Sequence, residues 1–500
     1  MNKFVKAMQV EDSYKLTENG ALAMSTTQDA LVDLFATIGA LRSRTDENIE
    51  KKFSDAFAED KLLATRMSFY ARNVRGGLGE RHTARVIWRF LAERHPDIMR
   101  KNLMYVPYFG RWDDLYSLMG TPVEDDAWNL IKVQFEEDMT ALEKRQNGEY
   151  AEISLLAKWL RNANSKNKQY AYQGYCTAKA LFGKGKDMLI RYRKARAALC
   201  SAIDVVEVKM SEGRFKDIKY PNVTSRAMLR YRSCFMKQDA DGFQNYLDSL
   251  QKGTAKVNAG ALVPYDIMHE YGLMTNYSYM TFSKGYDALL EEQWKALPNY
   301  VDGECNVLVM ADTSGSMSGR PIETAVGLAV YFAERNKGVF ANTFMTFARR
   351  PQFVTLKGDS LHERIKSIKA IVDNTNLEAA FDMILDTAVK NHIPQEDMPK
   401  TLVIISDMEF DYQTENPNCT YHDAMTQKYR RAGYEMPNVV YWNVASRQDT
   451  YHTDDVHKGV QMFSGQSAAT FKSVMQNIGK TPYEAMVNTL NQEPYTLIEV

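Results

Sequence analysis

The sequence predicts a multidomain protein in which an α-helical repeat precedes an α/β doubly wound domain. The 500-residue chain exceeds the size at which one hydrophobic core stops growing. Apolar residues recur at helical spacing from residue 28 to about 290, whereas short continuous apolar runs alternate with helical patterns after residue 300. We therefore expect an N-terminal extension over residues 1–27, a helical domain over 28–299, and an α/β domain with C-terminal helices over 300–500.

The helical half contains amphipathic segments separated by short polar breaks. Apolar residues spaced three and four apart predict helices over 29–41, 48–73, 80–93, 126–145, 154–162, 170–181 and 184–210. So many helices in succession, without a strong sequence repeat, favour a HEAT-like solenoid or ring in which neighbouring hairpins bury one another's apolar faces. Residues 258–299 are also expected to be mostly helical, with the domain boundary between Gly285 and Asn306.

The second half changes pattern at residues 305–311, a short aliphatic run typical of a buried parallel strand. Further strands are expected over 340–347, 352–356, 401–406, 439–444 and 460–463, and helices over 321–336, 360–372, 377–391 and 421–432. Alternation of strand and helix predicts a doubly wound, Rossmann-like parallel sheet. Ligands of such sheets bind at the carboxyl ends of the strands.

Composition restricts the classes of partner. The 62 Lys and Arg nearly cancel the 63 Asp and Glu, so the whole chain offers no electrostatic argument for a polyanion, and neither DNA nor a membrane is an expected partner. Five scattered cysteines indicate no disulfide framework and no zinc site. The first residues lack the apolar run of a signal peptide, and the longest apolar stretches are too short to span a bilayer. We expect a soluble, cytoplasmic monomer.

Oxygen-bearing side chains follow the first expected strand at alternate positions. Asp312, Ser314 and Ser316 lie on a glycine-containing turn, and Pro321 then opens a helix. Oxygens placed in this way can converge on one hard cation. A turn or helix cap is the alternative for such residues taken alone.

This arrangement resembles the metal-ion-dependent adhesion site of von Willebrand factor A domains. Thr375 matches that family's coordinating threonine, although Asp373 and Asn374 replace the usual preceding glycine, and Asp407 matches its distal aspartate, although Met408 follows where glycine is usual. The resemblance implies a divalent cation, Mg²⁺ or else Mn²⁺, held by Asp312, Ser314, Ser316, Thr375 and Asp407. An open coordination position would then accept an acidic oxygen of a ligand. A metal-free A domain that serves as a docking platform is the alternative.

A second group of candidates lies at an arginine-rich junction between two helices. Arg72, Arg75 and Arg81 flank a turn that contains Gly76, Gly77 and Gly79. A salt-bridged surface is the alternative for these arginines. The segments FYARNVRGGLGER (69–81) and YFGRWDDLY (108–116) nevertheless resemble the TROVE module of Ro RNA-binding proteins, and they are closer still to an uncharacterised Ro-like family.

The Ro resemblance implies that the helical repeats close into a basic ring that binds single-stranded ends of noncoding or misfolded RNA and small structured RNAs. Cations interleaved with aromatic residues are what single-stranded RNA requires. Such clusters contain Lys179, Lys184, Lys186, Arg191, Arg193 and Arg196, followed by Arg230 and Arg232. The alternative is that the aromatic residues are core residues and the lysines a solvated helix face.

We therefore expect a non-catalytic RNA-binding protein with a metal-dependent ligand site in its A domain, that is, a cytoplasmic ribonucleoprotein component. The sequence contains neither a nucleophile with a nearby base nor a phosphate-binding loop, so we do not expect an enzyme. The alternative is a protein-binding scaffold whose metal captures a partner's carboxylate.

Overall fold

The computed structural model describes residues 11–275, 279–301, 306–347, 350–369, 372, 375–412 and 420–500. The chain forms two compact units. Unit 1 comprises residues 1–71, 76–83 and 259–497, and unit 2 comprises residues 72–75, 84–258 and 498–500. These units do not coincide with a division at residue 300, because both the N-terminal 71 residues and residues 259–299 group with the α/β part of the chain.

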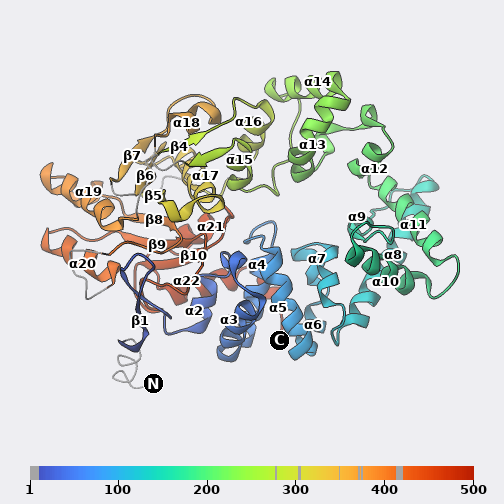
Figure 1. The fold of residues 1–500 in the computed structure, drawn as a ribbon, viewed down its shortest axis with the longest axis horizontal. Helices are drawn as coiled ribbons and strands as arrows, with labels where there is room; N and C mark the ends of the chain where they lie inside the picture. Colours follow the sequence, from blue (N-terminus) through green and yellow to red (C-terminus); the bar gives the residue numbers. More distant parts are fainter. Residues whose placement is uncertain are drawn as a thin grey trace. The chain divides into compact units, whose positions relative to one another are not determined.

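Unit 1 is built on a six-stranded mixed sheet of order β10-β9-β8-β5-β6-β7 (Figure 1). Its strands are β5 (Val307–Asp312), β6 (Thr343–Phe347), β7 (Gln352–Thr355), β8 (Thr401–Ser406), β9 (Asn438–Asn443) and β10 (Val460–Ser464). All neighbouring pairs are parallel except β6 and β7. The chain builds the sheet outward from β5, first through β6 and β7 and then, on the other side, through β8, β9 and β10. The strand order therefore reverses between β5 and β8, the place where doubly wound sheets bind ligands.

Helices cover this sheet. α17 (Arg320–Arg335) packs on β5, β6 and β8, while α19 (Leu377–Lys390) packs on β6 and on α20 (Tyr421–Arg431). α2 (Ala30–Phe35), α21 (Thr470–Gln476) and α22 (Pro482–Leu490) pack on β10. Every residue of β5 and β8 is buried, as their continuous apolar sequences predict.

Unit 1 also contains α3 (Asp46–Glu59), α4 (Lys61–Arg72), α15 (Pro264–Glu270), α16 (Ala288–Lys295) and α18 (Leu361–Ser367). The single helix expected over residues 48–73 is broken into α3 and α4. Asp60 takes an extended backbone at the end of α3, and its carboxylate accepts the Leu63 N–H at 2.8 Å. Asp60 therefore caps a new helix where the apolar periodicity alone showed no interruption.

Two short hairpins in unit 1 were not expected. β1 (Tyr14–Leu16) pairs with β2 (Leu22–Met24) inside the expected N-terminal extension, and β3 (Leu273–Thr275) pairs with β4 (Met280–Phe282) inside the segment expected to be helical. Three-residue strands are too short for a two-residue alternation to stand out in the sequence. The first hairpin is anchored on the sheet domain through bridges at Gly20 and Met24.

Among the residues that the structure describes, unit 2 contains helices and no strand. It contains α5 (Arg81–Arg94, which begins in unit 1), α6 (Pro96–Asn102), α7 (Tyr105–Phe109), α8 (Glu124–Gln146), α9 (Leu156–Trp159), α10 (Lys168–Phe182), α11 (Met188–Ala202), α12 (Val206–Ser211), α13 (Ser225–Gln238) and α14 (Ala240–Gln251). α10 packs against α11, and α13 against α14. The helix expected over 184–210 is divided into α11 and α12 at Asp204, whose φ is +53°. Among the described residues, no helix is both long and apolar enough to cross a bilayer.

Candidate functional site

The end of β5 and the loop that follows it hold three of the five expected metal-site residues. Asp312 is fully buried at the end of the strand, where its Oδ1 accepts the Ser314 N–H at 2.9 Å and its Oδ2 accepts the Ser406 hydroxyl at 2.5 Å. The Oγ atoms of Ser314 and Ser316 lie 3.0 Å apart. The sequence thus places three oxygen-bearing side chains together at the point where the strand order of the sheet reverses.

Asp407 follows β8, the neighbour of β5, and is also buried. Its carboxylate accepts a hydrogen bond from Ser316, and Arg447 Nη2 lies 2.7 Å from its Oδ2. Burial, followed by the charge of Asp407, raises the pKa of Asp312 to about 7. Burial also raises the pKa of Asp407, against the opposing effect of Arg447. Two buried carboxylates therefore repel one another at this edge of the sheet.

Thr375 is buried just before α19. Its carbonyl accepts the Asp411 N–H at 3.0 Å, which ties it to the loop that follows Asp407. The preceding residues, Asp373 and Asn374, lie outside the described residues. Asp312, Ser314, Ser316 and Asp407 therefore lie together at the carboxyl ends of β5 and β8, and Thr375 is joined through its backbone to the loop that follows Asp407.

The side chains at this edge fit a hard divalent cation. Two carboxylates and three hydroxyls provide the oxygen atoms that Mg²⁺ prefers, and a cation would relieve the repulsion between Asp312 and Asp407. Across the part of the chain that the structure describes, no three His, Cys, Asp or Glu side chains gather as metal ligands. Cation binding at the candidate site would therefore require the hydroxyl oxygens as well as the two carboxylates. A bound cation there would supply a Lewis-acidic position for a ligand oxygen.

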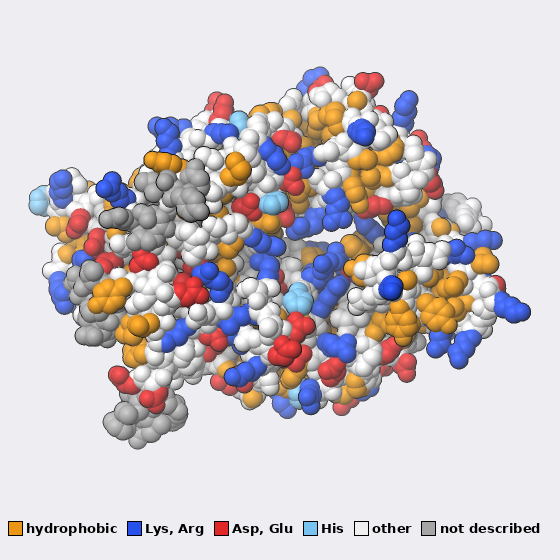
Figure 2. All heavy atoms as spheres, in the orientation of Figure 1, with side chains coloured by type: hydrophobic (Ala, Val, Ile, Leu, Met, Phe, Trp, Pro, Cys, Tyr) orange, Lys and Arg blue, Asp and Glu red, His pale blue; other side chains and the backbone are white. Residues whose placement is uncertain are grey.

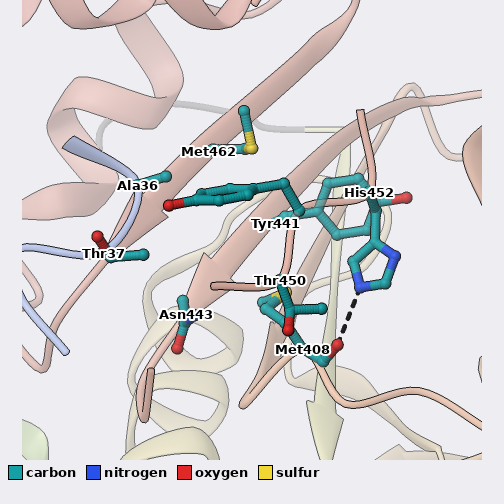
Figure 3. Close-up of a pocket in the computed structure, with 9 residues that line it drawn as sticks. Ala36, Thr37, Met408, Tyr441, Asn443, Thr450, His452 and Met462 are labelled. Atoms are coloured by element: carbon teal, nitrogen blue, oxygen red, sulfur yellow. Dashed lines mark hydrogen bonds between the residues drawn. The ribbon is translucent and has the colours of Figure 1, made fainter. Parts of the chain in front are cut away.

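Met408 adopts the backbone conformation that usually favours glycine. Its φ is +70°, and its carbonyl accepts a hydrogen bond from His452 Nε2 at 2.9 Å beside a small pocket (Figure 3). Burial lowers the pKa of His452 to about 4, so the ring is neutral at pH 7. The residue after Asp407 therefore keeps a left-handed turn without glycine, and His452 and the Ser406 hydroxyl, 3.1 Å from the Met408 nitrogen, hold that turn.

Arg72 does not occupy a position from which it could contact RNA, which corrects one of the expectations from the sequence. Its side chain is 2% exposed, and its Nε donates to Asp114 Oδ2 at 2.8 Å. The Arg72 guanidinium is therefore held in a buried ion pair with Asp114, a carboxylate that also pairs with Arg85. Arg75 and Arg81, at the same junction, are exposed, and Arg75 Nη1 donates to the Tyr108 carbonyl at 2.8 Å.

The other RNA-site candidates lie on two helical hairpins of unit 2. On α10, on α11 and in the turn between them, exposed positions are occupied by Lys179, Lys184, Lys186, Arg191 and Arg193. Arg196 is half-buried, with its Nε donating to the Leu160 carbonyl at 3.1 Å. Arg230 is exposed on α13, and Arg232 is half-buried there. Figure 2 shows blue Lys and Arg side chains beside orange hydrophobic ones over the part of the molecule that holds α8 to α11.

Three arginines that were not among the expected RNA-site residues gather around Asp113. Arg85, Arg111 and Arg161 all lie within 3.1 Å of the carboxylate of Asp113. They are widely separated along the chain, so no local spacing connects them. The one available signal was the acidic pair Asp113-Asp114 between aromatic residues, since buried carboxylates require cationic partners.

Two family models match successive parts of the chain. Residues 17–135 and 127–304 match a domain of unknown function, DUF2828, and residues 306–495 match another, DUF7788. The chain is also similar to an uncharacterised protein, L728, of Acanthamoeba polyphaga mimivirus, with 27% identity over 96% of this chain and 87% of the viral protein. These descriptions assign no activity, and the similarity to Ro proteins stays a prediction.

Proposed function

The chain belongs to the DUF2828 family, and we propose that it is a non-catalytic RNA-binding protein that holds single-stranded segments of noncoding or misfolded RNA on α10 and α11. The charge of one segment carries this proposal. Between Glu152 and Asp204 the sequence contains eleven Lys and Arg residues and a single acidic residue, Asp187. A chain with a net charge of −1 therefore concentrates positive charge in one helical hairpin and its flanks.

Exposed aromatic rings accompany this charge. On α10, Tyr172 is 64% exposed and Tyr175 is 46% exposed, and Lys179 is exposed one turn further along. Residues at these spacings share one face of a helix. Large aromatic side chains are usually buried, so two rings on a cationic face favour stacking with bases over a core role.

The test is binding of a fluorescent oligouridine to the full chain over a salt series. We expect affinity to fall steeply with ionic strength, because phosphates bound by Lys and Arg release counterions. Arg191→Glu/Arg193→Glu should abolish binding at moderate salt, and Tyr172→Leu/Tyr175→Leu should weaken it with an unchanged salt slope. Lys458→Glu/Lys472→Glu, which makes the same charge change on exposed lysines of unit 1, is the matched control. Absence of binding at low salt would overturn the proposal.

We also propose that the α/β part of unit 1 is a von Willebrand A-type domain whose Asp312, Ser314, Ser316, Thr375 and Asp407 hold Mg²⁺ or Mn²⁺. The position of these residues at the reversal of strand order supports this assignment. A metal held there would bind an acidic oxygen, either of RNA or of a partner protein. If partner capture were the main function, ligand binding would depend chiefly on Mg²⁺ or Mn²⁺ and only weakly on salt.

A further inference from the structure

An arginine cluster at the surface of unit 2 surrounds one buried carboxylate. Arg111 Nε lies 3.0 Å from Asp113 Oδ1, and the Nη2 atoms of Arg85 and Arg161 each lie 3.1 Å from Asp113 Oδ2. Arg85 also pairs with Asp114 at 2.6 Å. We refer to Arg85, Arg111, Arg161 and Asp113 as the arginine cradle.

The cradle and its immediate neighbours carry more positive than negative charge. Four guanidiniums, those of the cradle and Arg72, share the carboxylates of Asp113 and Asp114. Burial acts to raise the pKa of Asp113, but Arg111, Arg85 and Arg161 outweigh it and the pKa is lowered. Asp113 is therefore ionised at neutral pH, and the group retains about two positive charges at a half-buried surface.

The carboxylates lie beneath the guanidiniums. Asp113 and Asp114 side chains are 3% and 0% exposed, whereas those of Arg85, Arg111 and Arg161 are 23%, 26% and 17% exposed. Solvent and ligands therefore meet the cationic side of the cluster. This layering differs from an ordinary surface salt bridge, in which both partners face water.

Aromatic rings fix the orientation of two guanidiniums. Arg111 stacks over Trp159 at 4.1 Å, and Arg161 stacks over Tyr170 at 4.0 Å and lies 5.4 Å from Tyr116. A stacked guanidinium loses little further rotational freedom on binding a ligand. The cradle is thus preorganised to offer guanidinium N–H donors to an oxyanion.

We propose that the arginine cradle binds a phosphate of single-stranded RNA, an inference that rests on the proposed RNA-binding function and locates one phosphate within it. Guanidiniums match phosphate oxygens in charge and in bidentate geometry. Tyr170 connects the cradle to the first turn of α10, and Tyr172 and Tyr175 lie further along that helix. A strand whose phosphate occupies the cradle can therefore continue along the exposed tyrosines.

The first test uses inorganic pyrophosphate and an arginine-selective dicarbonyl reagent on the unmodified full chain, with labelling read by peptide mass spectrometry. Pyrophosphate should protect Arg111 and Arg161 relative to chloride at equal ionic strength, whereas exposed Arg430 on α20 should label equally in both. Equal labelling of Arg111 and Arg161 with and without pyrophosphate would overturn the cradle as an anion site. This measurement needs no variant and so cannot fail through misfolding.

The second test compares pyrophosphate affinity among variants. Arg161→Gln should weaken binding by about tenfold, since one charge-assisted contact is lost, and Arg430→Gln should leave it unchanged. Asp113→Asn should instead strengthen binding, because it removes the carboxylate that competes for the same donors. A purely structural network predicts the opposite for Asp113→Asn, namely loss of stability without a gain in anion affinity.

Oligouridine then separates the two proposals. Protection of Arg111 and Arg161 by oligouridine as well as by pyrophosphate supports the inference. Oligouridine that binds the chain without protecting these arginines overturns the inference and leaves the proposed function standing. If pyrophosphate protects Arg111 and Arg161 but the chain binds no RNA, then RNA is not the ligand of the cradle, and the proposed function is overturned as well.

Discussion

Replacement of Asp114 by Asn should strongly destabilise unit 2. Asp114 is fully buried; its Oδ2 accepts from Arg72 Nε at 2.8 Å and from the Arg111 backbone N–H at 2.9 Å, and its Oδ1 accepts from Arg85 Nε at 2.7 Å. The Asn amide would lack the charge and would place N–H donors against guanidinium donors. Arg72, 2% exposed, would then remain charged in the core without a counter-ion.

The magnitude follows from the burial of this pair. Removal of one partner of a buried ion pair costs about 3–5 kcal/mol, because it leaves an uncompensated charge. That is a large fraction of the 5–15 kcal/mol of unfolding free energy typical of a domain. At roughly 2–4 °C per kcal/mol for a domain of this size, the melting temperature of unit 2 should fall by about 10 °C.

Tryptophan fluorescence during urea unfolding can follow this effect, because four of the six tryptophans, Trp88, Trp112, Trp128 and Trp159, belong to unit 2. Glu143→Gln, which removes the same charge at an exposed position of α8, is the control and should shift the unfolding free energy by less than about 0.5 kcal/mol. If the Asp114 and Glu143 variants unfold at the same urea concentration, the Arg72–Asp114 pair does not stabilise the unit and the reasoning is wrong.

Two further predictions concern unit 1. The pKa of Asp312 is raised to about 7. Between about pH 4 and pH 7, the folded metal-free protein therefore keeps a proton on Asp312 that the unfolded chain has lost. The free energy of unfolding should fall by about 4 kcal/mol as the pH rises through this range. Asp312→Asn should flatten this slope in EDTA, and Mg²⁺ should raise the wild-type melting temperature more at pH 8 than at pH 5.5; equal pH slopes in both proteins would contradict this. Gly39→Ala should cost about 1–3 kcal/mol in a denaturant titration, because the new Cβ would lie 2.7 Å from the backbone carbonyl of Ser464. Gly260→Ala, whose Cβ would meet nothing within 4 Å, is its control, and equal midpoints would show that the backbone can move apart.

The helical and α/β character of the two halves could be predicted because hydrophobic periodicity reports burial directly. The strand expected over residues 401–406 is β8 residue for residue, and the other sheet strands differ by a few residues at their ends. The short hairpins β1–β2 and β3–β4 could not be predicted, since three-residue strands leave no measurable period. The association of residues 1–71 with the sheet domain also left no local signal, because it depends on long-range contacts such as the Thr17 hydroxyl donating to the Phe410 carbonyl.

The expected metal-site residues could be located from the sequence because each follows a recognisable strand or precedes a helix. In a doubly wound sheet, the ends of such strands meet at one edge, so linear order is enough to bring Asp312 and Asp407 together. The arginine-rich site followed no such rule. Arg72 and Arg75 are three residues apart, yet one is buried against Asp114 and the other is exposed, and helical spacing cannot distinguish an ion-paired core arginine from a ligand-binding one.

The charge of this chain is unevenly distributed along the sequence, which the net charge alone does not show. A net charge of −1 argues against a polyanion partner only if the charges are evenly mixed, and here residues 153–203 hold eleven cations and one anion. Nucleic acids respond to the local potential over about one Debye length, roughly 8–10 Å at physiological salt, and not to the sum over the molecule. The proposed binding of RNA to the cationic hairpin α10–α11 is therefore compatible with a net charge of −1, because acidic residues elsewhere keep the net charge near zero. The same locality explains why charge reversal at Arg191 and Arg193 should abolish RNA binding, whereas the equal change at Lys458 and Lys472 should not.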